Sequence, residues 1–143
     1  MRLIGEKVGG QLARYMYRKM LLPMSSDIRY IGAINEDLQI LAVVAYNLWL
    51  DDSVFMHVAV EQPRYFRFLI REAFTYAFVT CKKSRVYGLT PITSVEALRL
   101  SKRLGFRKVH TTPDFVLQVM DKAECRWIDD SECQSRSGAC AVQ

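Results

Sequence analysis

The sequence predicts a single α+β (mixed α/β) domain, in which a central, mostly antiparallel sheet is flanked by helices. Its 143 residues suit one domain of ordinary size, and hydrophobic residues make up 50% of them, which is enough for a core. The hydrophobic spacing predicts the order helix, three strands, helix, strand, helix, two strands. Because strands follow one another directly, antiparallel pairing is favoured. We expect the domain to span residues 1–122 and a tail to span residues 123–143.

The first half of the chain is predicted as a helix followed by three strands. Over residues 11–22 apolar positions recur at helical spacing between basic ones, and Pro23 ends the pattern. Residues 28–34 and 38–50 are rich in β-branched and aromatic residues, and a turn-like Asn-Glu-Asp joins them. These two segments therefore predict an antiparallel hairpin. A second turn, Asp-Asp-Ser, leads into the third predicted strand, residues 54–60.

The second half begins with another helical stripe. Apolar residues recur at helical spacing over residues 66–78, and the helix is expected to end near Lys82, where positive charge suits the helix dipole. Residues 85–91 are apolar enough for a buried strand. A third helix is predicted over residues 94–104, ended by Gly105, because glycine adopts left-handed backbone without steric strain.

The last predicted elements form a closing antiparallel pair. Residues 106–112 and 115–121 alternate well between apolar and polar side chains, and Pro113-Asp114 separates them. No internal repeat and no linker between domains interrupts the pattern. The elements are therefore expected to belong to one sheet.

The charge and the cysteine and histidine content limit which ligands and partners are expected. The net charge of +5 favours an anionic partner, but the basic residues are dispersed, so a plain solvated surface is an equal interpretation. No nucleic-acid-binding motif is present, and nucleic acid is not an expected partner. The four cysteines lack CxxC spacing and the chain has two histidines, so no metal site is expected. Reduced thiols are favoured over a disulfide framework.

Membrane contact is not expected either. The longest apolar stretch, residues 38–50, is interrupted by polar residues and is too short to cross a bilayer. The first ten residues do not have the charged and apolar regions of a secretory signal. The sequence therefore predicts a cytoplasmic protein.

The end of the third predicted helix carries the most specific pattern in the chain. It reads EALRLSKRLGFRKV, with an alanine, then leucines, then a basic residue directly before Leu-Gly-Phe. This pattern and the order of the elements resemble the Gcn5-related N-acetyltransferase (GNAT) superfamily. The resemblance covers roughly residues 29–120, and the positions that carry it are Ala97, Leu100, Arg103, Leu104, Gly105 and Phe106.

The resemblance implies a cofactor, acetyl-CoA, and a place for it. In the family the pantetheine arm lies between two strands that diverge, here residues 54–60 and 85–89, and bonds to backbone groups of the first. Val58 and Val60 are the corresponding positions in this chain. The pyrophosphate would be held by backbone N–H groups at the start of the long helix. The acceptor would be a primary amine whose identity the sequence does not show.

The chain departs from the family at the pyrophosphate loop. The family normally has glycines there, because glycine lets backbone amides close around phosphate. This chain has VEQPRYFRFLIREAF, which contains no glycine. Arg64, Tyr65 and Arg67 are the candidates to bind the cofactor in place of that cradle, with the two arginines as phosphate ligands. Two arginines beside aromatic residues are also common on ordinary surfaces.

The positions that correspond to catalytic residues of the family also carry different residues in this chain. Ser94 occupies the place of the family's asparagine, where it could bind the cofactor or only cap the helix. Ser101 stands where the family often has the tyrosine that protonates the leaving thiolate. Glu61 and His57 are the candidate general bases. An exposed strand end would explain Glu61 equally, and a half-buried structural histidine would explain His57.

Two functions are therefore predicted. The first is a GNAT-fold N-acetyltransferase that transfers acetyl from acetyl-CoA to a primary amine. The alternative is a catalytically inactive GNAT-fold bacteriophage protein with a structural or assembly role in the virion, because such proteins have weak or absent glycine loops. In that case no cofactor would be needed. The protein would contact other virion proteins and be found in the host cytoplasm or the virion.

Overall fold

The structure, a computed structural model, describes residues 2–5, 10–23 and 25–128. It contains seven strands in these residues, one more than the sequence predicts. The strands are β1 (Arg2–Gly5), β2 (Arg29–Ile34), β3 (Ile40–Asn47), β4 (Ser53–Val60), β5 (Arg85–Pro91), β6 (Arg107–Thr111) and β7 (Phe115–Asp121). The helical segments are α1 (Gln11–Met20), η1 (Pro63–Phe68), α2 (Ile70–Phe74), η2 (Thr75–Thr80), α3 (Val95–Leu104) and η3 (Lys122–Glu124).

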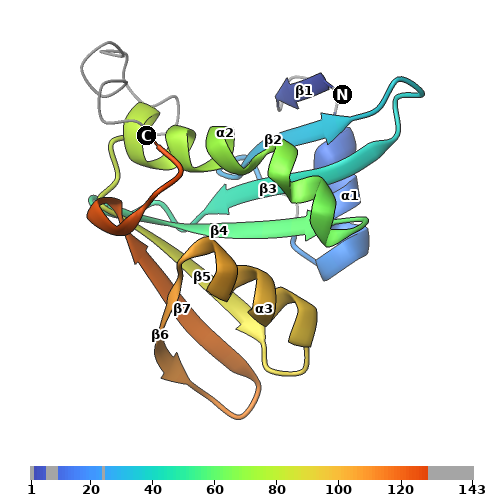
Figure 1. Cartoon of the computed structure of the whole chain (residues 1–143). Coiled ribbons are helices and arrows are strands. Elements are labelled where there is room, and N and C mark those ends of the chain that lie inside the picture. The colour runs from blue at the N-terminus through green and yellow to red at the C-terminus, as the bar shows by residue number, and fades with distance from the viewer. Residues whose placement is uncertain (1, 6–9, 24, 129–143) are drawn as a thin grey trace.

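The strands form a single sheet in the order β1-β2-β3-β4-β5-β7-β6. All neighbours are antiparallel except β4 and β5, which run parallel. That parallel pair is joined only from Ser53 to Phe55 on β4, opposite Arg85 to Tyr87 on β5. Beyond this point the two strands diverge, as Figure 1 shows. The mostly antiparallel sheet flanked by helices confirms the predicted fold class.

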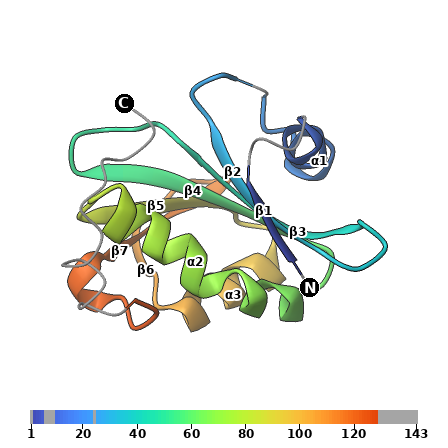
Figure 2. The same ribbon diagram turned by 90° about the horizontal axis from the view of Figure 1, so that it is seen from above.

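Helices cover both faces of the sheet. Figure 2 shows α1 on one face and α2 and α3 on the other. β3 is buried from both sides, so Val44 and Tyr46 pack with α2 while Val43 and Ala45 pack with α1. This explains why β3 is a continuous apolar run without alternation. The core under α2 is the larger one, and its bulkiest members are Tyr46, Phe66, Phe74 and Phe78.

β1 is the strand that the sequence does not predict. It has four residues and pairs antiparallel with β2, from Arg2 opposite Ile34 to Gly5 opposite Ile31. A run this short carries no alternation that can be recognised. Its conformation comes from pairing with the free edge of β2, which is a tertiary contact.

The second predicted helix is not one regular helix. The segment begins with the 3₁₀ turns of η1 at Pro63, continues as α2, and ends in the wider π turns of η2 at Thr80. In η2 the N–H of Cys81 donates to the carbonyl of Tyr76, 2.8 Å away. The apolar stripe predicts which side chains are buried, but each of these three patterns lasts only five or six residues, which is too short for the sequence to distinguish their periods.

The predicted stop of the third helix is confirmed. Gly105 has φ 112°, and its N–H donates to the carbonyls of Ser101 and Lys102. Adjacent to this turn, the Trp127 indole donates to the Leu104 carbonyl over 2.9 Å. Residues 123–128, which the sequence assigns to the tail, thus lie against the domain, and residues 129–143 are outside the described part of the chain.

Two further findings concern expectations from composition. Cys81 is disulfide-bonded, so the expectation of reduced thiols is wrong for this residue, whereas Cys125 is a free thiol. No helix among the described residues is long and apolar enough to span a membrane.

Candidate functional site

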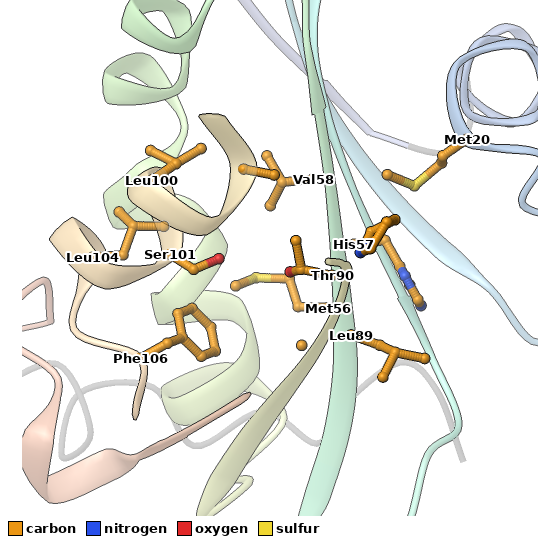
Figure 3. A pocket seen from close by; sticks show the side chains of 13 residues that line it. Met20, Met56, His57, Val58, Leu89, Thr90, Leu100, Ser101, Leu104 and Phe106 are labelled. Carbon is orange, nitrogen blue, oxygen red and sulfur yellow. The ribbon is translucent and has the colours of Figure 1, made fainter. Parts of the chain in front are cut away.

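The divergence of β4 and β5 opens a wedge-shaped cavity, called the wedge below. Its narrow part has a volume of about 100 Å³ and its wide part about 440 Å³. Both parts are lined by Met20, Val58, Ala97 and Leu100, so they adjoin. Figure 3 shows the narrow part, with Val58 and Met56 on one side and Leu100, Leu104 and Ser101 on the other. The wedge therefore lies between β4, β5 and α3.

The backbone of β4 faces the wedge at alternate residues. The N–H of Glu61 donates to the Leu41 carbonyl of β3, and the Ser53 carbonyl accepts from Leu50. Odd-numbered residues of β4 thus direct their polar groups at β3. The alternation of an antiparallel ladder turns the N–H and C=O of Met56, Val58 and Val60 away from β3. In the described ladder the pairing with β5 ends at Phe55 opposite Tyr87, so the groups of Val58 and Val60 line a gap rather than a sheet interior.

His57 lines the narrow part of the wedge. Its Nε2 lies 2.7 Å from Oδ1 of Asn47 on β3. Oδ1 is only an acceptor, so as placed the ring carries its hydrogen on Nε2 and leaves the Nδ1 lone pair unprotonated. Burial lowers the pKa of His57 from its ordinary 6.5, because the charged form is poorly solvated there. At neutral pH the imidazole is therefore the uncharged base.

Glu61 lies at the mouth of the wide part and is bound to α1. Its Oε2 is 2.7 Å from Nζ of Lys19, and it also accepts a hydrogen bond from the Tyr15 hydroxyl. These bonds, first that of Lys19 and then that of Tyr15, lower the pKa of Glu61. A carboxylate held in this way is a weak base, because protonating it breaks both interactions.

Ser101 and Thr90 supply the hydroxyl groups of the narrow part. Figure 3 shows Ser101 on α3 with its oxygen toward the cavity, on the side away from His57. The Thr90 hydroxyl donates to Oε1 of buried Gln118 over 3.1 Å and keeps an acceptor lone pair. His57 and Ser101 thus approach one cavity from opposite walls.

Ser94 lines the wide part of the wedge. It stands at the N-cap position of α3, but its side chain makes no capping hydrogen bond. The hydroxyl is therefore not used as the helix cap that the sequence offered as one explanation. Ser94 and Val60 share the wide part with Glu61.

The remaining candidates, Arg64, Tyr65 and Arg67, do not line the wedge. Arg64 places its guanidinium 5.2 Å from the ring centroid of Tyr65, and Arg67 lies 4.9 Å from that of Phe68. Both arginines are exposed on η1, whose first residue, Pro63, does line the wide part. They are thus close to the wedge along the chain but directed onto neighbouring rings.

Several lining residues were missed by sequence reasoning. Lys19 and Met20 come from α1, where they follow the helical pattern like any surface residue. Phe106 lines the narrow part and belongs to the Leu-Gly-Phe ending. The motif could therefore have indicated that Phe106 lies at the site. No group of three or more His, Cys, Asp or Glu side chains within the described ranges is placed to hold a metal ion.

Comparison with known proteins identifies the fold. No protein-family model matches the chain, and no curated protein matches it in sequence. Solved structures do match. Campylobacter jejuni N-acetyltransferase PseH in complex with acetyl coenzyme A is similar with TM-score 0.59 and 18% identity, covering 77% of each chain.

Two structures of a Vibrio cholerae enzyme are also similar. Spermidine N-acetyltransferase in complex with CoA and spermine has TM-score 0.61 and 15% identity, covering 78% of this chain and 75% of that one. Spermidine/spermine N-acetyltransferase SpeG with manganese ions has TM-score 0.67 and 12% identity, covering 85% and 92%. At these identities the likeness concerns the fold. The chain therefore has the fold of the GNAT N-acetyltransferases, with β4 and β5 diverging around the wedge.

Proposed function

We propose that this protein is an acetyl-CoA-dependent N-acetyltransferase acting on a primary amine. The observation that carries the proposal is the wedge, into which Val58 and Val60 of β4 turn backbone groups that belong to neither the β3 ladder nor the β5 ladder. Amide groups of a pantetheine arm would extend the β4 ladder there, as an added strand does. The apolar walls, Leu100 and Leu104 among them, suit its methylene groups.

Acetyl-CoA supplies an acetyl thioester, whose transfer to an amine nitrogen forms an amide and releases the thiol. A backbone N–H of β4 would donate to the thioester carbonyl and stabilise the charge that develops on its oxygen. His57, with its free Nδ1, is the better placed base to take the proton that the amine loses. Glu61 is less suited to this role because its carboxylate is already bound by Lys19 and by the Tyr15 hydroxyl.

Ser101 is the candidate to return a proton to the thiolate. It faces the narrow part of the wedge from α3, on the wall opposite His57. A serine hydroxyl is a poor acid, so it would act chiefly as a hydrogen-bond donor that stabilises the thiolate. Ser94 would reach the cofactor farther out, in the wide part.

The pyrophosphate of the cofactor would need side-chain ligands, because the loop before α2 contains no glycine. Arg64 and Arg67 are exposed near Pro63, and both can leave their ring contacts to bind phosphate oxygens. Tyr65 would follow Arg64, to which its hydroxyl is already hydrogen-bonded at 3.4 Å. The alternative, an inactive virion protein, stays a prediction of the sequence, since the solved structures compared above are enzymes.

Calorimetric titration with CoA and acetyl-CoA tests the proposal. We expect saturable binding to the wild type and at least a tenfold weaker affinity, roughly the loss of one charged hydrogen bond, when Arg64→Ala and Arg67→Ala are combined. Arg99→Ala, at an exposed position on α3 that does not line the wedge, is the matched control. No detectable heat from the wild type at millimolar ligand would overturn the proposed function.

A further inference from the structure

His57 is bonded to a residue that lies outside the wedge. Its Nε2 is 2.7 Å from Oδ1 of Asn47, and this pair of side chains is partly buried. Asn47 is the last residue of β3 and lines neither part of the wedge. Any part that Asn47 takes in a reaction there therefore passes through the imidazole.

The register of the sheet explains how the two side chains meet. In the β3–β4 ladder Ala45 lies directly opposite His57, and Asn47 lies opposite Phe55, so Asn47 and His57 are diagonal neighbours. Residues two apart on a strand point to the same face, and here that face also carries Ala59, which packs with α1. Diagonal partners are within reach of long side chains. The small Ala45 leaves the space across which the imidazole reaches the amide.

A ring contact keeps Phe55, the direct cross-strand partner of Asn47, turned toward β5. Phe55 stacks on Tyr87, with ring centroids 5.3 Å apart and the ring planes at 24°. These two residues also lie opposite each other at the end of the parallel ladder. The ring of Phe55 is thus engaged where β4 and β5 part, and the Asn47 amide is left to His57.

An amide is a distinctive partner for a histidine. As an acceptor, Oδ1 selects the tautomer that carries its hydrogen on Nε2, because the hydrogen bond made by one ring nitrogen decides which nitrogen is protonated. Unlike a carboxylate, the amide has no charge and does not stabilise the imidazolium as an opposite charge would. Asn47 therefore orients the ring while His57 remains an uncharged base.

We propose that Asn47 is a positioning residue, which fixes the tautomer and the orientation of the His57 imidazole so that Nδ1 is the nitrogen that accepts the proton of the amine. This inference rests on the proposed function, because it states how the base of that reaction is held. The amine nitrogen forms a bond to the acetyl carbon and loses its proton to Nδ1. The C–S bond breaks with its electron pair on sulfur, and the imidazolium then releases the proton to solvent.

The tautomer is tested first, without turnover, in the full chain. Nitrogen-15 NMR shifts of a neutral imidazole distinguish the protonated ring nitrogen from the unprotonated one. We expect a protonated Nε2 in the wild type, and we expect the two shifts to approach each other in Asn47→Leu, because both tautomers then become populated. The other histidine, His110, is exposed and is the internal reference. A wild type protonated on Nδ1, or unchanged shifts in Asn47→Leu, would overturn the proposal.

Asn47→Asp is the conservative variant, because it keeps the shape and the acceptor and adds a charge. It should retain the hydrogen on Nε2 and raise the pH at which His57 titrates, since an opposite charge favours the imidazolium. The charged groups on the neighbouring elements are the same in both proteins and do not affect the comparison; they are Arg14, Arg18, Lys19, Glu61 and Arg85. If Asn47→Leu does not fold, an unchanged titration of His57 in Asn47→Asp would overturn the proposal.

Kinetics test whether this positioning serves the reaction. Acetyl transfer is measured with spermidine, ethanolamine and tyramine, and the amine with the highest wild-type kcat/KM is used for the variants. Asn47→Leu should lower kcat roughly 10- to 100-fold and leave KM for acetyl-CoA unchanged, because a misplaced base slows the chemical step but not cofactor binding. Asn47→Asp should recover most of the loss. An altered tautomer with an unchanged kcat would make the contact purely structural and overturn the positioning role.

Gln39→Leu is the matched control. The Gln39 side chain is exposed in the β2–β3 turn and accepts a hydrogen bond of 2.8 Å from the Asn35 amide. The variant therefore loses the same kind of side-chain bond at the other end of β3. It should leave the nitrogen shifts of His57 and kcat as in the wild type.

The two proposals fail in different ways. A wild type that binds no CoA refutes the proposed function, while the nitrogen shifts still decide whether Asn47 holds the ring. A wild type that binds CoA and acetylates an amine, with an Asn47→Leu variant that changes neither the shifts nor kcat, keeps the proposed function and overturns the role of Asn47.

Discussion

Lys19 Nζ lies 2.7 Å from Glu61 Oε2 and thereby joins the last turn of α1 to the end of β4. The Tyr15 hydroxyl donates to the same oxygen. Both partners favour the ionised carboxylate and hold the pKa of Glu61 below its ordinary 4.5. This contact fixes α1 beside the wide part of the wedge.

The first prediction concerns Glu61→Gln. A lowered carboxyl pKa stabilises folding at pH values above the ordinary value, and this stabilisation is lost as pH falls through the lowered folded value. Because the side chains are about two-fifths exposed, the effect should be modest, up to about 1 kcal/mol in the free energy of unfolding at pH 7. Urea denaturation at pH 7 and pH 3 measures it.

The difference between Glu61→Gln and wild type should shrink toward pH 3. Glu36→Gln, at an exposed position in the β2–β3 turn, is the control and should leave stability nearly unchanged at both pH values. A fall in kcat of several orders of magnitude in Glu61→Gln, without a loss of stability, would instead identify Glu61 as the general base.

The second prediction concerns His57. Its pKa is lowered by burial, so the unfolded chain binds a proton more readily, and stability should decline as pH falls below about 6.5. The His57 imidazole signal in NMR, assigned by its absence in His57→Gln, should titrate below that pH. If His57 is the base, His57→Gln should lower kcat by roughly 100-fold and remove the acidic limb of the pH profile. An unchanged kcat would exclude that role.

The third prediction compares two prolines in β4. Val58→Pro removes an N–H that faces the wedge, whereas Ala59→Pro removes one that belongs to the β3 ladder. Proline is tolerated in a strand where its missing N–H had no partner. We expect Val58→Pro to fold but to lose CoA binding, and Ala59→Pro to lose several kcal/mol of stability, roughly 3 or more.

Circular dichroism melts and calorimetry separate these outcomes. If Val58→Pro folds and binds CoA as the wild type does, the backbone of β4 does not hold the pantetheine arm at this residue. If both variants unfold alike, the alternation described for β4 is wrong.

The fourth prediction concerns the turn after α3. Gly105 has φ 112°, and a Cβ there would meet no atom closer than 3.5 Å, so Gly105→Ala is strained by its backbone alone. The expected cost is about 1–2 kcal/mol. Gly88→Ala is the matched control, because its nearest neighbour would be 3.9 Å away and its φ is not positive. Urea denaturation should show a loss for Gly105→Ala and almost none for Gly88→Ala.

Much of the fold could be predicted from the sequence because the spacing of apolar residues indicates which side chains are buried. The stripe from Phe66 to Phe78 identifies the side chains that form the larger core, and Gly105 marks a helix end through its own backbone freedom. The change from 3₁₀ to α to π turns between Pro63 and Thr80 was not predictable, since each pattern lasts only five or six residues and shows no period of its own.

The site was predictable only in part. His57, Val58 and Ser101 follow from the family resemblance and meet in the narrow part of the wedge. Glu61 was identified as a candidate base, yet its bonds to Tyr15 and Lys19 join residues 46 and 42 positions apart, and no local pattern reports such a pair. The positive charge of Arg64 and Arg67 makes them candidate phosphate ligands, whereas their direction onto neighbouring rings depends on side-chain packing.

The sequence by itself determined six of the seven strands, the positions of the three main helical segments, the buried face of the second of these, and the end of α3, because these properties depend on residues close together in the chain. Only the tertiary structure decided that β1 joins the sheet, that β4 and β5 part after Phe55, and that α1 brings Tyr15 and Lys19 to Glu61. Such features depend on groups brought together from distant segments, and their energies arise only when the chain has folded.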